Sequence, residues 1–488
     1  MKSWDEEADV VVVGFGGAGA ATAIAAADHG ANVVVLEKQP ESRHTPSTKM
    51  GGGALMTVTD PDPAARYLDL CAAGMVPAEV SQAWAQRASK VLDWVNDICD
   101  VEYQRSIGAE HPELPGAAAV QSYEAVGYGN GLFTALAASV RRRDTVRTIF
   151  DSPASRLVRD GEQRVVGVEV ATSGGLRRVG ARQGVVLTCG GYEYNDDMKR
   201  NYLKGEPIHF YGNPGNTGDG VLMAQAIGAD LWHMNQMIGR AIGHFEFPDG
   251  TSVNGLVIIG DLMKPGNPVG YVLTDGLGRR FANEHMQAMS RHDFYYELIK
   301  YDPASGTFPR NPCYWFFDQR RMRLGTPVAT NMGPLAFGYY DWSADSEAEI
   351  ARHWISRADT IEKAAEAAGV ADPAQAAAEI AAYNEACRTG QDLFGRPVES
   401  LIPLDEAPYY CMALYPGGSN TCGGPRRNQY AQVVDVFGDP ISGLYAAGEL
   451  GEPVGLLYPS NGANISDCLC FGQIAAEHAL GLVGQPSC

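Results

Sequence analysis

Apolar runs that end at glycine alternate with alanine-rich stretches near the start of this chain. Residues 10–13 are four valines and predict a buried strand, and residues 33–36 (Val-Val-Val-Leu) predict a second one. The alanine-rich stretch between them has the composition of a helix. The pattern therefore predicts a strand, turn, helix, strand unit, which is typical of an α/β fold.

The same pattern returns later in the chain. Residues 185–187 form another apolar run with a glycine exit at residues 190–191, and residues 443–448 form a third run near the C-terminus. Alanine-rich residues 361–369 and 372–387 have apolar positions at helical spacing and predict surface helices. Segments far apart in the sequence are therefore expected to build one α/β fold.

Length, charge and cysteine usage narrow the class of protein. At 488 residues the chain exceeds the roughly 250–300 residues at which single cores stop growing, so two domains are expected. A formal net charge of -20 opposes binding to a phosphate backbone, so no nucleic acid partner is expected.

The start has no apolar signal core and no stretch reaches the roughly 20 apolar residues of a membrane span, which predicts a cytoplasmic protein. The ten cysteines lack a Cys-x-x-Cys spacing and predict buried thiols rather than a metal site.

The turn after the first strand carries the most specific motif. Its sequence, Gly14-Phe-Gly-Gly-Ala-Gly19, has the spacing Gly-x-Gly-x-x-Gly, and Glu37 ends the second strand. The first two glycines, Gly14 and Gly16, allow a tight turn and close approach to a pyrophosphate, and Gly19 lets helix and strand pack. The helix N-terminus offers N–H groups to the phosphates, and Glu37 can accept the ribose hydroxyls. The motif predicts dinucleotide binding.

Motifs spread over nearly the whole chain extend this prediction. They are Gly51-Gly52-Gly53, Cys189-Gly190-Gly191, Thr217-Gly-Asp219-Gly220, Gly278-Arg-Arg-Phe-Ala-Asn-Glu284, Thr421-Cys-Gly-Gly424, Gly448-Glu449 and Asp467-Cys-Leu-Cys-Phe-Gly472. Together with the N-terminal motif, they make the chain resemble the fumarate reductase/succinate dehydrogenase flavoprotein superfamily. The resemblance implies a Rossmann-type FAD-binding domain at residues 1–228 and 406–488, with an inserted α+β substrate (capping) domain at residues 229–405. A cofactor as long as FAD needs contacts from both ends of the chain, which favours FAD over NAD.

The N-terminal motif and the resemblance together name the residues expected to bind FAD. They are Gly14, Gly16, Gly17, Ala18, Gly19, Glu37, Lys38, Gly52, Gly53, Gly190, Gly191, Asp219, Gly448, Glu449, Asn464 and Ile465. His44 lies near the position at which membrane-bound relatives attach FAD covalently, but its spacing differs from theirs. Non-covalent FAD is therefore expected, and a covalent bond to His44 is the alternative.

One segment departs from the fumarate reductases. The positions at which they carry a histidine and an arginine that clamp a dicarboxylate are Gly455 and Pro459 in this chain. Residues 456–462 (Leu-Leu-Tyr-Pro-Ser-Asn-Gly) instead offer an apolar approach that ends in a phenol and a hydroxyl. Such a surface suits a small hydrophobic ketone as the substrate.

This segment resembles the 3-ketosteroid dehydrogenases, in which a Tyr-Pro-x-x-Gly motif holds the substrate carbonyl. The resemblance assigns that role to the Tyr458 hydroxyl and the Gly462 N–H. Ser460 makes the segment similar to the Δ4-(5α) branch, whereas the Δ1 branch has glycine at that position. Tyr314, in the apolar run 313–318, falls where both branches supply another essential tyrosine.

The chemistry expected of these residues is desaturation beside a carbonyl. Tyr458 and the Gly462 N–H would donate to the carbonyl oxygen and stabilise the enolate that develops as a base removes the Cα proton. Ser460 with Tyr314 is the candidate relay for that proton, and the Cβ hydrogen leaves as hydride to flavin N5. No metal is required, and an external electron acceptor must reoxidise the flavin.

The favoured interpretation is 4,5-dehydrogenation of a 5α-3-ketosteroid. The same fold also suits a 3-ketosteroid Δ1-dehydrogenase, a dehydrogenase of a small cyclohexanone-type ketone, or an enone or fumarate-type reductase that runs the reaction in reverse. In a purely structural interpretation, Tyr458 and Ser460 only shape a loop and Tyr314 is a core aromatic. A non-enzymatic electron carrier is a further alternative, and it predicts no need for these three residues.

Overall fold

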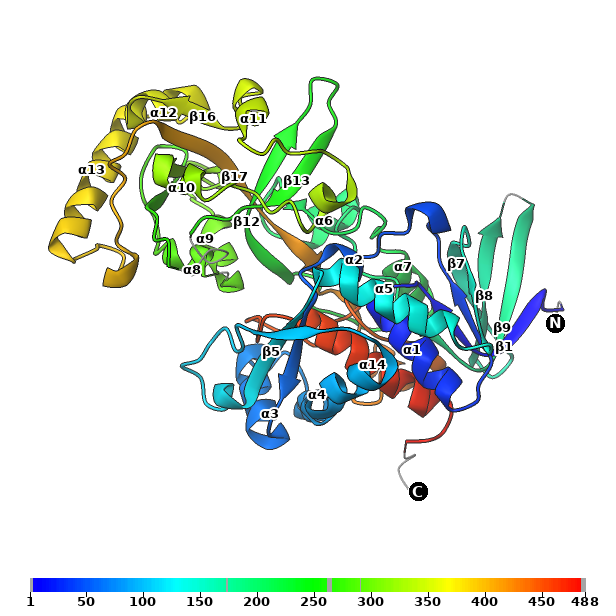
Figure 1. Ribbon diagram of the computed structural model, residues 1–488. Coiled ribbons are helices and arrows are strands. Elements are labelled where there is room, and N and C mark those ends of the chain that lie inside the picture. Colours follow the sequence, from blue (N-terminus) through cyan, green and yellow to red (C-terminus); the bar gives the residue numbers. More distant parts are fainter. Residues whose placement is uncertain (1–2, 173, 261–265, 290, 484–488) are drawn as a thin grey trace. The chain divides into compact units, whose positions relative to one another are not determined.

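The computed structural model describes residues 3–172, 174–260, 266–289 and 291–483 (Figure 1). The chain divides into two compact units. Unit 1 comprises residues 1–203, 212–237 and 420–488, and unit 2 comprises residues 204–211 and 238–419. Helices and sheets are both present, which confirms the predicted α/β class. The assignment of an FAD-binding and a substrate domain to particular residue ranges stays a prediction.

Unit 1 is built on a sheet whose central strands are parallel. Its parallel part runs in the order β20 (Pro440–Ala446), β9 (Gly175–Leu187), β1 (Glu6–Val13), β2 (Val33–Leu36) and β6 (Val146–Ile149). Antiparallel strands extend it: β19 (Gln432–Val434) pairs with β20, and β8 (Val165–Thr172) pairs with β9 and with β7 (Ala154–Arg159). The N-terminal and C-terminal parts of the chain therefore share one sheet, as the returning apolar runs predict.

The apolar runs are buried because both faces of this sheet are covered. Val10–Val13 pair with Val33–Leu36 on one side and with the end of β9 on the other, and the four valines of β1 are at most 5% exposed. Helices α1 (Gly17–Asp28) and α14 (Ala463–Ala479) pack against each other beside the sheet (Figure 1, dark blue and red). A Cβ on Gly472 would lie 2.8 Å from the Ala18 carbonyl oxygen, so this glycine allows the two helices to approach closely.

The other elements of unit 1 complete its core. The helices are α2 (Ser47–Met50), α3 (Pro61–Ala72), α4 (Ala78–Ile98), α5 (Tyr128–Arg141), α6 (Asp196–Tyr202) and α7 (Asp219–Gln225). The strands are β3 (Ala54–Val58), β4 (Tyr103–Ser106) and β5 (Val120–Ala125), which form one antiparallel sheet, and β11 (Leu231–Trp232) with β18 (Gly424–Pro425), which form another.

Unit 2 has its own mixed sheet and core. The strand order is β13 (Ser252–Leu256), β12 (Met237–Glu246), β17 (Tyr409–Thr421), β15 (Cys313–Asp318) and β14 (Tyr271–Thr274), and β10 (His209–Phe210) and β16 (Ser356–Ala358) also pair with β17. Its helices are α8 (His285–Ala288), α9 (Tyr295–Leu298), α10 (Gln319–Arg323), α11 (Glu347–Ala351), α12 (Ile361–Ala368) and α13 (Pro373–Thr389). The last two confirm the helices predicted from alanine-rich spacing, and Thr360 and Asp372 cap their N-termini.

Strand β15 shows why this part of the chain is apolar. Alternate side chains point to opposite faces of a strand. Cys313, Trp315 and Phe317 belong to one buried cluster, whereas Tyr314 and Phe316 belong to another, which also contains residues of α12 and α13. Both faces of the strand are therefore core.

The described cysteines form no disulfide with one another, and all of them are buried or half-buried. This agrees with the buried thiols predicted from their spacing. Among the helices that the structure describes, none is both long and apolar enough to cross a membrane.

Candidate functional site

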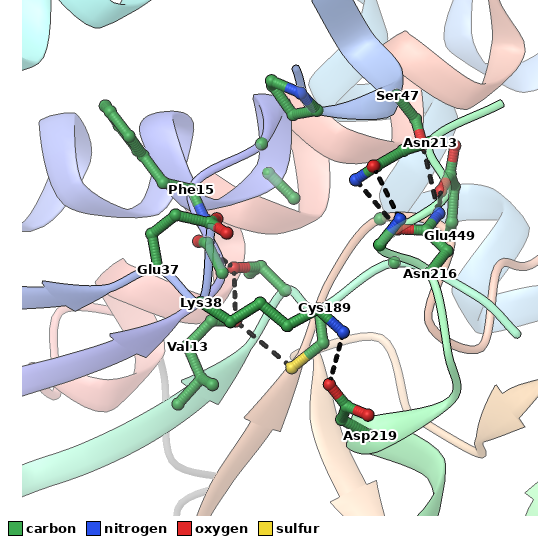
Figure 2. A pocket seen from close by; sticks show the side chains of 18 of the residues that line it. Val13, Phe15, Glu37, Lys38, Ser47, Cys189, Asn213, Asn216, Asp219 and Glu449 are labelled. Carbon is green, nitrogen blue, oxygen red and sulfur yellow. Dashed lines mark hydrogen bonds and ion pairs between the residues drawn. The ribbon is translucent and has the colours of Figure 1, made fainter. Parts of the chain in front are cut away.

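Unit 1 contains a pocket with about 730 Å³ of empty space at the carboxyl ends of its parallel strands. Its wall includes residues directly at or after the ends of β1, β2, β9 and β20. Parallel α/β sheets bind ligands at this edge. The residues that line it come from all three chain segments of unit 1, and Figure 2 shows side chains from each of them.

Backbone contacts force glycine at the turn that opens this pocket. Gly14 has a φ of +104°, and a Cβ there would lie 2.5 Å from the Thr188 carbonyl oxygen. A Cβ on Gly19 would lie 2.1 Å from the Gly14 carbonyl oxygen. Helix α1 begins after Gly16 without a side-chain cap, and its first residues line the pocket. The helix N-terminus is thus presented to the pocket, where it suits a phosphate group.

Glu37 provides a fixed carboxylate at the end of β2. Its Oε2 accepts the Phe15 N–H at 2.9 Å, and its Oε1 accepts the Gln39 N–H at 2.8 Å. Burial opposes ionisation, but His44 and these two N–H groups outweigh it and lower the pKa of Glu37. Glu37 is therefore a charged acceptor, as the binding of ribose hydroxyls requires.

His44 lies behind Glu37 in an aromatic enclosure. Its Nε2 is 3.5 Å from Glu37 Oε2, and its ring stacks on Phe15 with an interplanar angle of 2°. Phe133 and Phe150 pack edge-on against the same ring. Glu37 and Phe15 line the pocket, whereas His44 is not among the lining residues. These contacts give His44 a packing role beside the carboxylate and support non-covalent binding of the cofactor.

Charged and amide side chains also line the pocket. Lys38 Nζ forms an ion pair with Asp219 Oδ2 at 2.6 Å, and Figure 2 shows the two side chains pointing toward each other. Asn216 Nδ2 donates to Glu449 Oε2 at 3.1 Å and to Ser47 Oγ at 3.1 Å. Burial, together with the charge of a nearby carboxyl, raises the pKa of Glu449 to about 8.

The structure brings ten of the predicted cofactor residues to the pocket wall. They are Gly14, Gly16, Gly17, Ala18, Glu37, Lys38, Gly190, Asp219, Gly448 and Glu449. Six predicted residues do not line it: Gly19, Gly52, Gly53, Gly191, Asn464 and Ile465. Gly19 and Gly191 have tight backbone or side-chain neighbours where a Cβ would stand. Contact of these six with FAD stays a prediction.

Several lining residues were not predicted from the sequence. Thr48 Oγ1 accepts the Gly17 N–H at 3.0 Å, which orients the first turn of α1. Asn213 and Asn216 belong to the loop Asn-Pro-Gly-Asn that directly precedes Thr217-Gly-Asp-Gly. The clustering of Asn, Pro and Gly marks that loop as a turn next to a motif, and this is the signal that could have identified it.

The segment predicted to hold a substrate carbonyl forms the entry to α14. The Tyr458 hydroxyl oxygen accepts the Asn464 N–H at 3.1 Å, so the phenol lies at the N-terminus of this helix. Gly462 has a φ of +84° and a Cβ there would lie 2.4 Å from the Ala54 carbonyl carbon. Among the described residues, the Gly462 N–H has no hydrogen-bond partner. Burial raises the pKa of Tyr458 well above its ordinary value, so the phenol keeps its proton.

The two predicted relay hydroxyls both donate to backbone carbonyls. The Ser460 hydroxyl is fully buried and donates to the Gly108 carbonyl at 3.0 Å. The Tyr314 hydroxyl donates to the Gly369 carbonyl at 3.2 Å, and burial raises its pKa. Ser460 belongs to unit 1 and Tyr314 to unit 2, so their cooperation in a relay stays a prediction.

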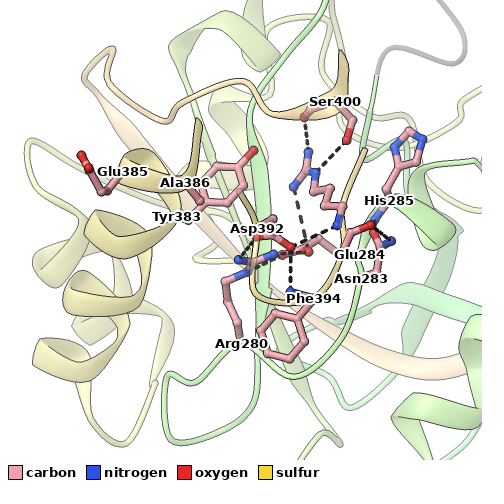
Figure 3. A network of polar contacts seen from close by, with 12 residues as sticks. Arg280, Asn283, Glu284, His285, Tyr383, Glu385, Ala386, Asp392, Phe394 and Ser400 are labelled. Atoms are coloured by element: carbon pink, nitrogen blue, oxygen red, sulfur yellow. Dashed lines mark hydrogen bonds and ion pairs between the residues drawn. The ribbon is translucent and has the colours of Figure 1, made fainter. Parts of the chain in front are cut away.

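The Arg-Phe-Ala-Asn-Glu motif lies in unit 2 and forms a buried ion-pair network (Figure 3). Arg280 pairs with Glu284 at 2.7 Å and with Asp392 at 2.6 Å, and these three side chains are at most 4% exposed. Arg396 donates to the Tyr271 carbonyl at 2.7 Å in the same network. The motif therefore ties the loop after α13 to strand β14.

The model of the FAD binding domain family matches residues 9–465. This chain belongs to that family. Its pocket fits the cofactor, because a helix N-terminus, a charged acceptor and glycines with no room for a Cβ line one cavity. The cofactor is FAD.

Relatives of this chain reduce or dehydrogenate organic substrates. The digoxin reductase of Eggerthella lenta is 25% identical over 98% of this chain and 88% of its own length. The 3-ketosteroid Δ1-dehydrogenase from Sterolibacterium denitrificans, in complex with 1,4-androstadiene-3,17-dione, has a TM-score of 0.83 and 23% identity over 98% of this chain and 100% of that chain. The 3-ketosteroid Δ4-(5α)-dehydrogenase from Rhodococcus jostii RHA1, in complex with 4-androstene-3,17-dione, has a TM-score of 0.71 and 22% identity over 98% of each chain.

Other relatives are named as 3-oxosteroid 1-dehydrogenases and fumarate reductases. The predicted resemblance to this superfamily is thereby confirmed, and the protein is an FAD-dependent oxidoreductase. The solved structures show the shared fold. At 22–23% identity they do not separate the Δ4-(5α) branch from the Δ1 branch.

We predict that Glu37→Gln weakens FAD binding by about 10- to 100-fold, because hydrogen bonds to a charged acceptor contribute about 1.5–3 kcal/mol. Flavin fluorescence titration of the apoprotein measures the affinity. Glu41→Gln is the matched control, since Glu41 is 67% exposed on the nearby surface. Equal FAD affinity of Glu37→Gln and the wild type would contradict the assigned role of Glu37.

We also predict that Glu284→Gln lowers the free energy of unfolding by about 3–5 kcal/mol, because it leaves the buried Arg280 with one charged partner fewer. Chemical denaturation followed by circular dichroism measures the change. Arg388→Ala removes the exposed Arg388–Glu385 pair and is expected to leave the midpoint unchanged. A Glu284→Gln variant as stable as the control would show that the network contributes little.

Proposed function

We propose that the protein desaturates a cyclic ketone, with a 3-ketosteroid as the favoured substrate and the 4,5 bond of a 5α-3-ketosteroid as the favoured position. The observation that carries this proposal is the placement of the Tyr458 phenol at the N-terminus of α14, whose N-cap residue Gly462 has an N–H without a hydrogen-bond partner among the described residues. A phenol that keeps its proton and a helix N-terminus both stabilise negative charge on an oxygen atom. This arrangement suits a carbonyl whose oxygen becomes an enolate.

The residues around this site support a neutral substrate. The loop that leads to Tyr458 carries Leu456 and Leu457, and Gly455 and Pro459 supply no cation for a carboxylate. Tyr67 fixes the loop, because its hydroxyl donates to the Pro459 carbonyl at 2.6 Å. An apolar approach with two donors at its end favours a hydrophobic ketone over a dicarboxylate.

Each group would have a defined task in the reaction. Tyr458 and the Gly462 N–H would bind the carbonyl oxygen and acidify the Cα proton. Tyr314 with Ser460 is the proposed proton relay. To take part in it, each hydroxyl would have to break the hydrogen bond that it donates to a backbone carbonyl. FAD supplies the acceptor for the hydrogen that leaves Cβ. An external electron acceptor then completes the turnover.

The relatives keep three alternatives open for the same site. A Δ1-dehydrogenase would remove hydrogen from the other side of the carbonyl. A dehydrogenase of a small cyclohexanone-type ring would use the same carbonyl contacts with a smaller substrate. An enone reductase would run the chemistry in reverse, and the similarity to the digoxin reductase supports this direction.

Anaerobic mixing of the holoenzyme with 5α-androstane-3,17-dione tests the proposal. We expect the visible flavin absorption to bleach and a 4-ene product to be identified by mass spectrometry and NMR. A 1-ene product would assign the enzyme to the Δ1 branch, and bleaching by cyclohexanone alone would exclude the steroid. Absence of bleaching with every ketone, combined with oxidation of reduced flavin by an enone, would establish the reductase alternative. If no ketone bleaches the oxidised flavin and no enone oxidises the reduced flavin, a ketone substrate is contradicted.

We predict that Tyr458→Phe lowers kcat/KM by about 100- to 1,000-fold, because it removes one of two donors to the developing enolate. Steady-state kinetics with the ketone that bleaches the flavin measure this loss. The control, Tyr339→Phe, removes a hydroxyl from a tyrosine that is 50% exposed in unit 2. A loss of less than about threefold in Tyr458→Phe, with FAD still bound, would exclude the phenol as a donor in the transition state.

A further inference from the structure

Glu452 is a completely buried carboxyl group without a charged partner. Its side chain is 0% exposed, its Oε2 accepts a long hydrogen bond, 3.4 Å, from Asn420 Nδ2, and the Cys422 thiol is a further weak partner of the carboxyl group. In the described part of the chain its Oε1 has no hydrogen-bond partner, and no basic side chain forms an ion pair with Glu452. An isolated buried carboxylate is costly, so such a group holds its proton.

The groups around Glu452 also favour its protonated form. Asp467 on α14 and Glu449 on the same loop carry like charge, and the Cys422 thiol lies beside the carboxyl. Arg427 is the cation of the cluster, and it pairs with Asp467 at 2.5 Å. Burial first, and then Asp467 and Glu449, raise the pKa of Glu452 well above its ordinary value, although Arg427 lowers it. Arg427 thus forms its ion pair with Asp467, and among the described residues Glu452 forms none.

The backbone holds Glu452 in this place. Its N–H donates to the Cys422 carbonyl at 3.0 Å. Its carbonyl oxygen lies 2.7 Å from His233 Nδ1, which donates to it. The carboxyl group therefore cannot move to solvent without breaking contacts to two other segments of unit 1.

Two asparagines connect Glu452 to the Tyr458 phenol. Asn464 Nδ2 donates to Asn420 Oδ1 at 2.5 Å, and Asn420 in turn donates to Glu452. The backbone N–H of the same Asn464 donates to the Tyr458 hydroxyl oxygen. Among the ionisable groups whose negative charge would raise the pKa of the phenol, Glu452 has the largest effect and Glu110 the next, and the Cys422 thiol also contributes.

We propose that Glu452 is a positioning residue that must remain protonated: as a neutral acid it anchors Asn420 and Asn464 beside Tyr458, and as an anion it would disable the carbonyl site. This role rests on the proposed function, because an extra negative charge beside Tyr458 opposes an enolate and has no such effect on a site that stabilises a cation. Ionisation of Glu452 is then one cause of activity loss at alkaline pH. Glu452 would act through Asn420 and Asn464 and would not contact the reacting atoms itself.

The test compares the holoenzyme with Glu452→Gln, whose amide has the same shape and cannot ionise. We expect kcat/KM of the wild type to fall at alkaline pH. In Glu452→Gln, with kcat/KM normalised to its own maximum, we expect this fall to occur about one pH unit or more higher. Glu113→Gln is the matched control, because Glu113 is 58% exposed in the neighbouring loop. We expect its pH profile to coincide with that of the wild type.

A second measurement needs no turnover. We expect the infrared spectrum of the substrate-free holoenzyme at neutral pH to contain a deuterium-sensitive band of a protonated carboxylic acid that Glu452→Gln lacks. Absence of a difference at this band overturns the proposal, because Glu452 would then be ionised. The proposal is also overturned if kcat/KM of the wild type and of Glu452→Gln falls over the same alkaline pH range. Failure of the wild type to turn over any ketone overturns the proposed function and this role with it, while the infrared band still reports the proton on Glu452.

Discussion

Close backbone contact at the carboxyl end of β1 is the constraint on which the rest of unit 1 depends. Gly14 faces the Thr188 carbonyl, and Gly19 faces the Gly14 carbonyl, at distances that leave no room for a Cβ. This contact brings the N-terminus of α1 to the end of the parallel strands, where helix N–H groups and the strand-end residue Glu37 meet in one pocket. A larger residue at either glycine would separate helix and strands, and the pocket would lose the geometry that suits a dinucleotide.

A second set of close contacts connects this pocket with the proposed carbonyl site. Gly472 lets α14 lie against α1, and Gly462 lies directly against the backbone of β3, where the Met56 N–H donates to the Gly462 carbonyl at 3.1 Å. The N-terminus of α14, with Tyr458 beside it, is therefore fixed by elements from the first part of the chain. Cys468, one turn into the same helix, lines the cofactor pocket. One helix thus contributes to both the flavin pocket and the proposed carbonyl site.

The sequence was most informative where function depends on local pattern. The valine runs, the Gly-x-Gly-x-x-Gly spacing and Glu37 predicted the first βαβ unit and its pocket, because tight turns and buried parallel strands leave few choices of residue. It was less informative where partners lie far apart in the chain. The carbonyl partners of Ser460 and Tyr314 are 352 and 55 residues away, and no periodicity reveals such contacts. Glu452 was missed for the same reason, because its burial and its lack of a cation arise only when α14, β17 and the loop at Arg427 come together.

A crystal structure of the holoenzyme with a bound 3-ketosteroid tests the central claim most directly. The account predicts FAD in the pocket of unit 1, with its ribose hydroxyls at Glu37, and the steroid C3 oxygen about 2.7–3.1 Å from both the Tyr458 hydroxyl and the Gly462 nitrogen. A ketone oxygen that contacts other groups, with Tyr458 and Gly462 facing only protein, would contradict the proposed carbonyl site even if FAD occupies its pocket.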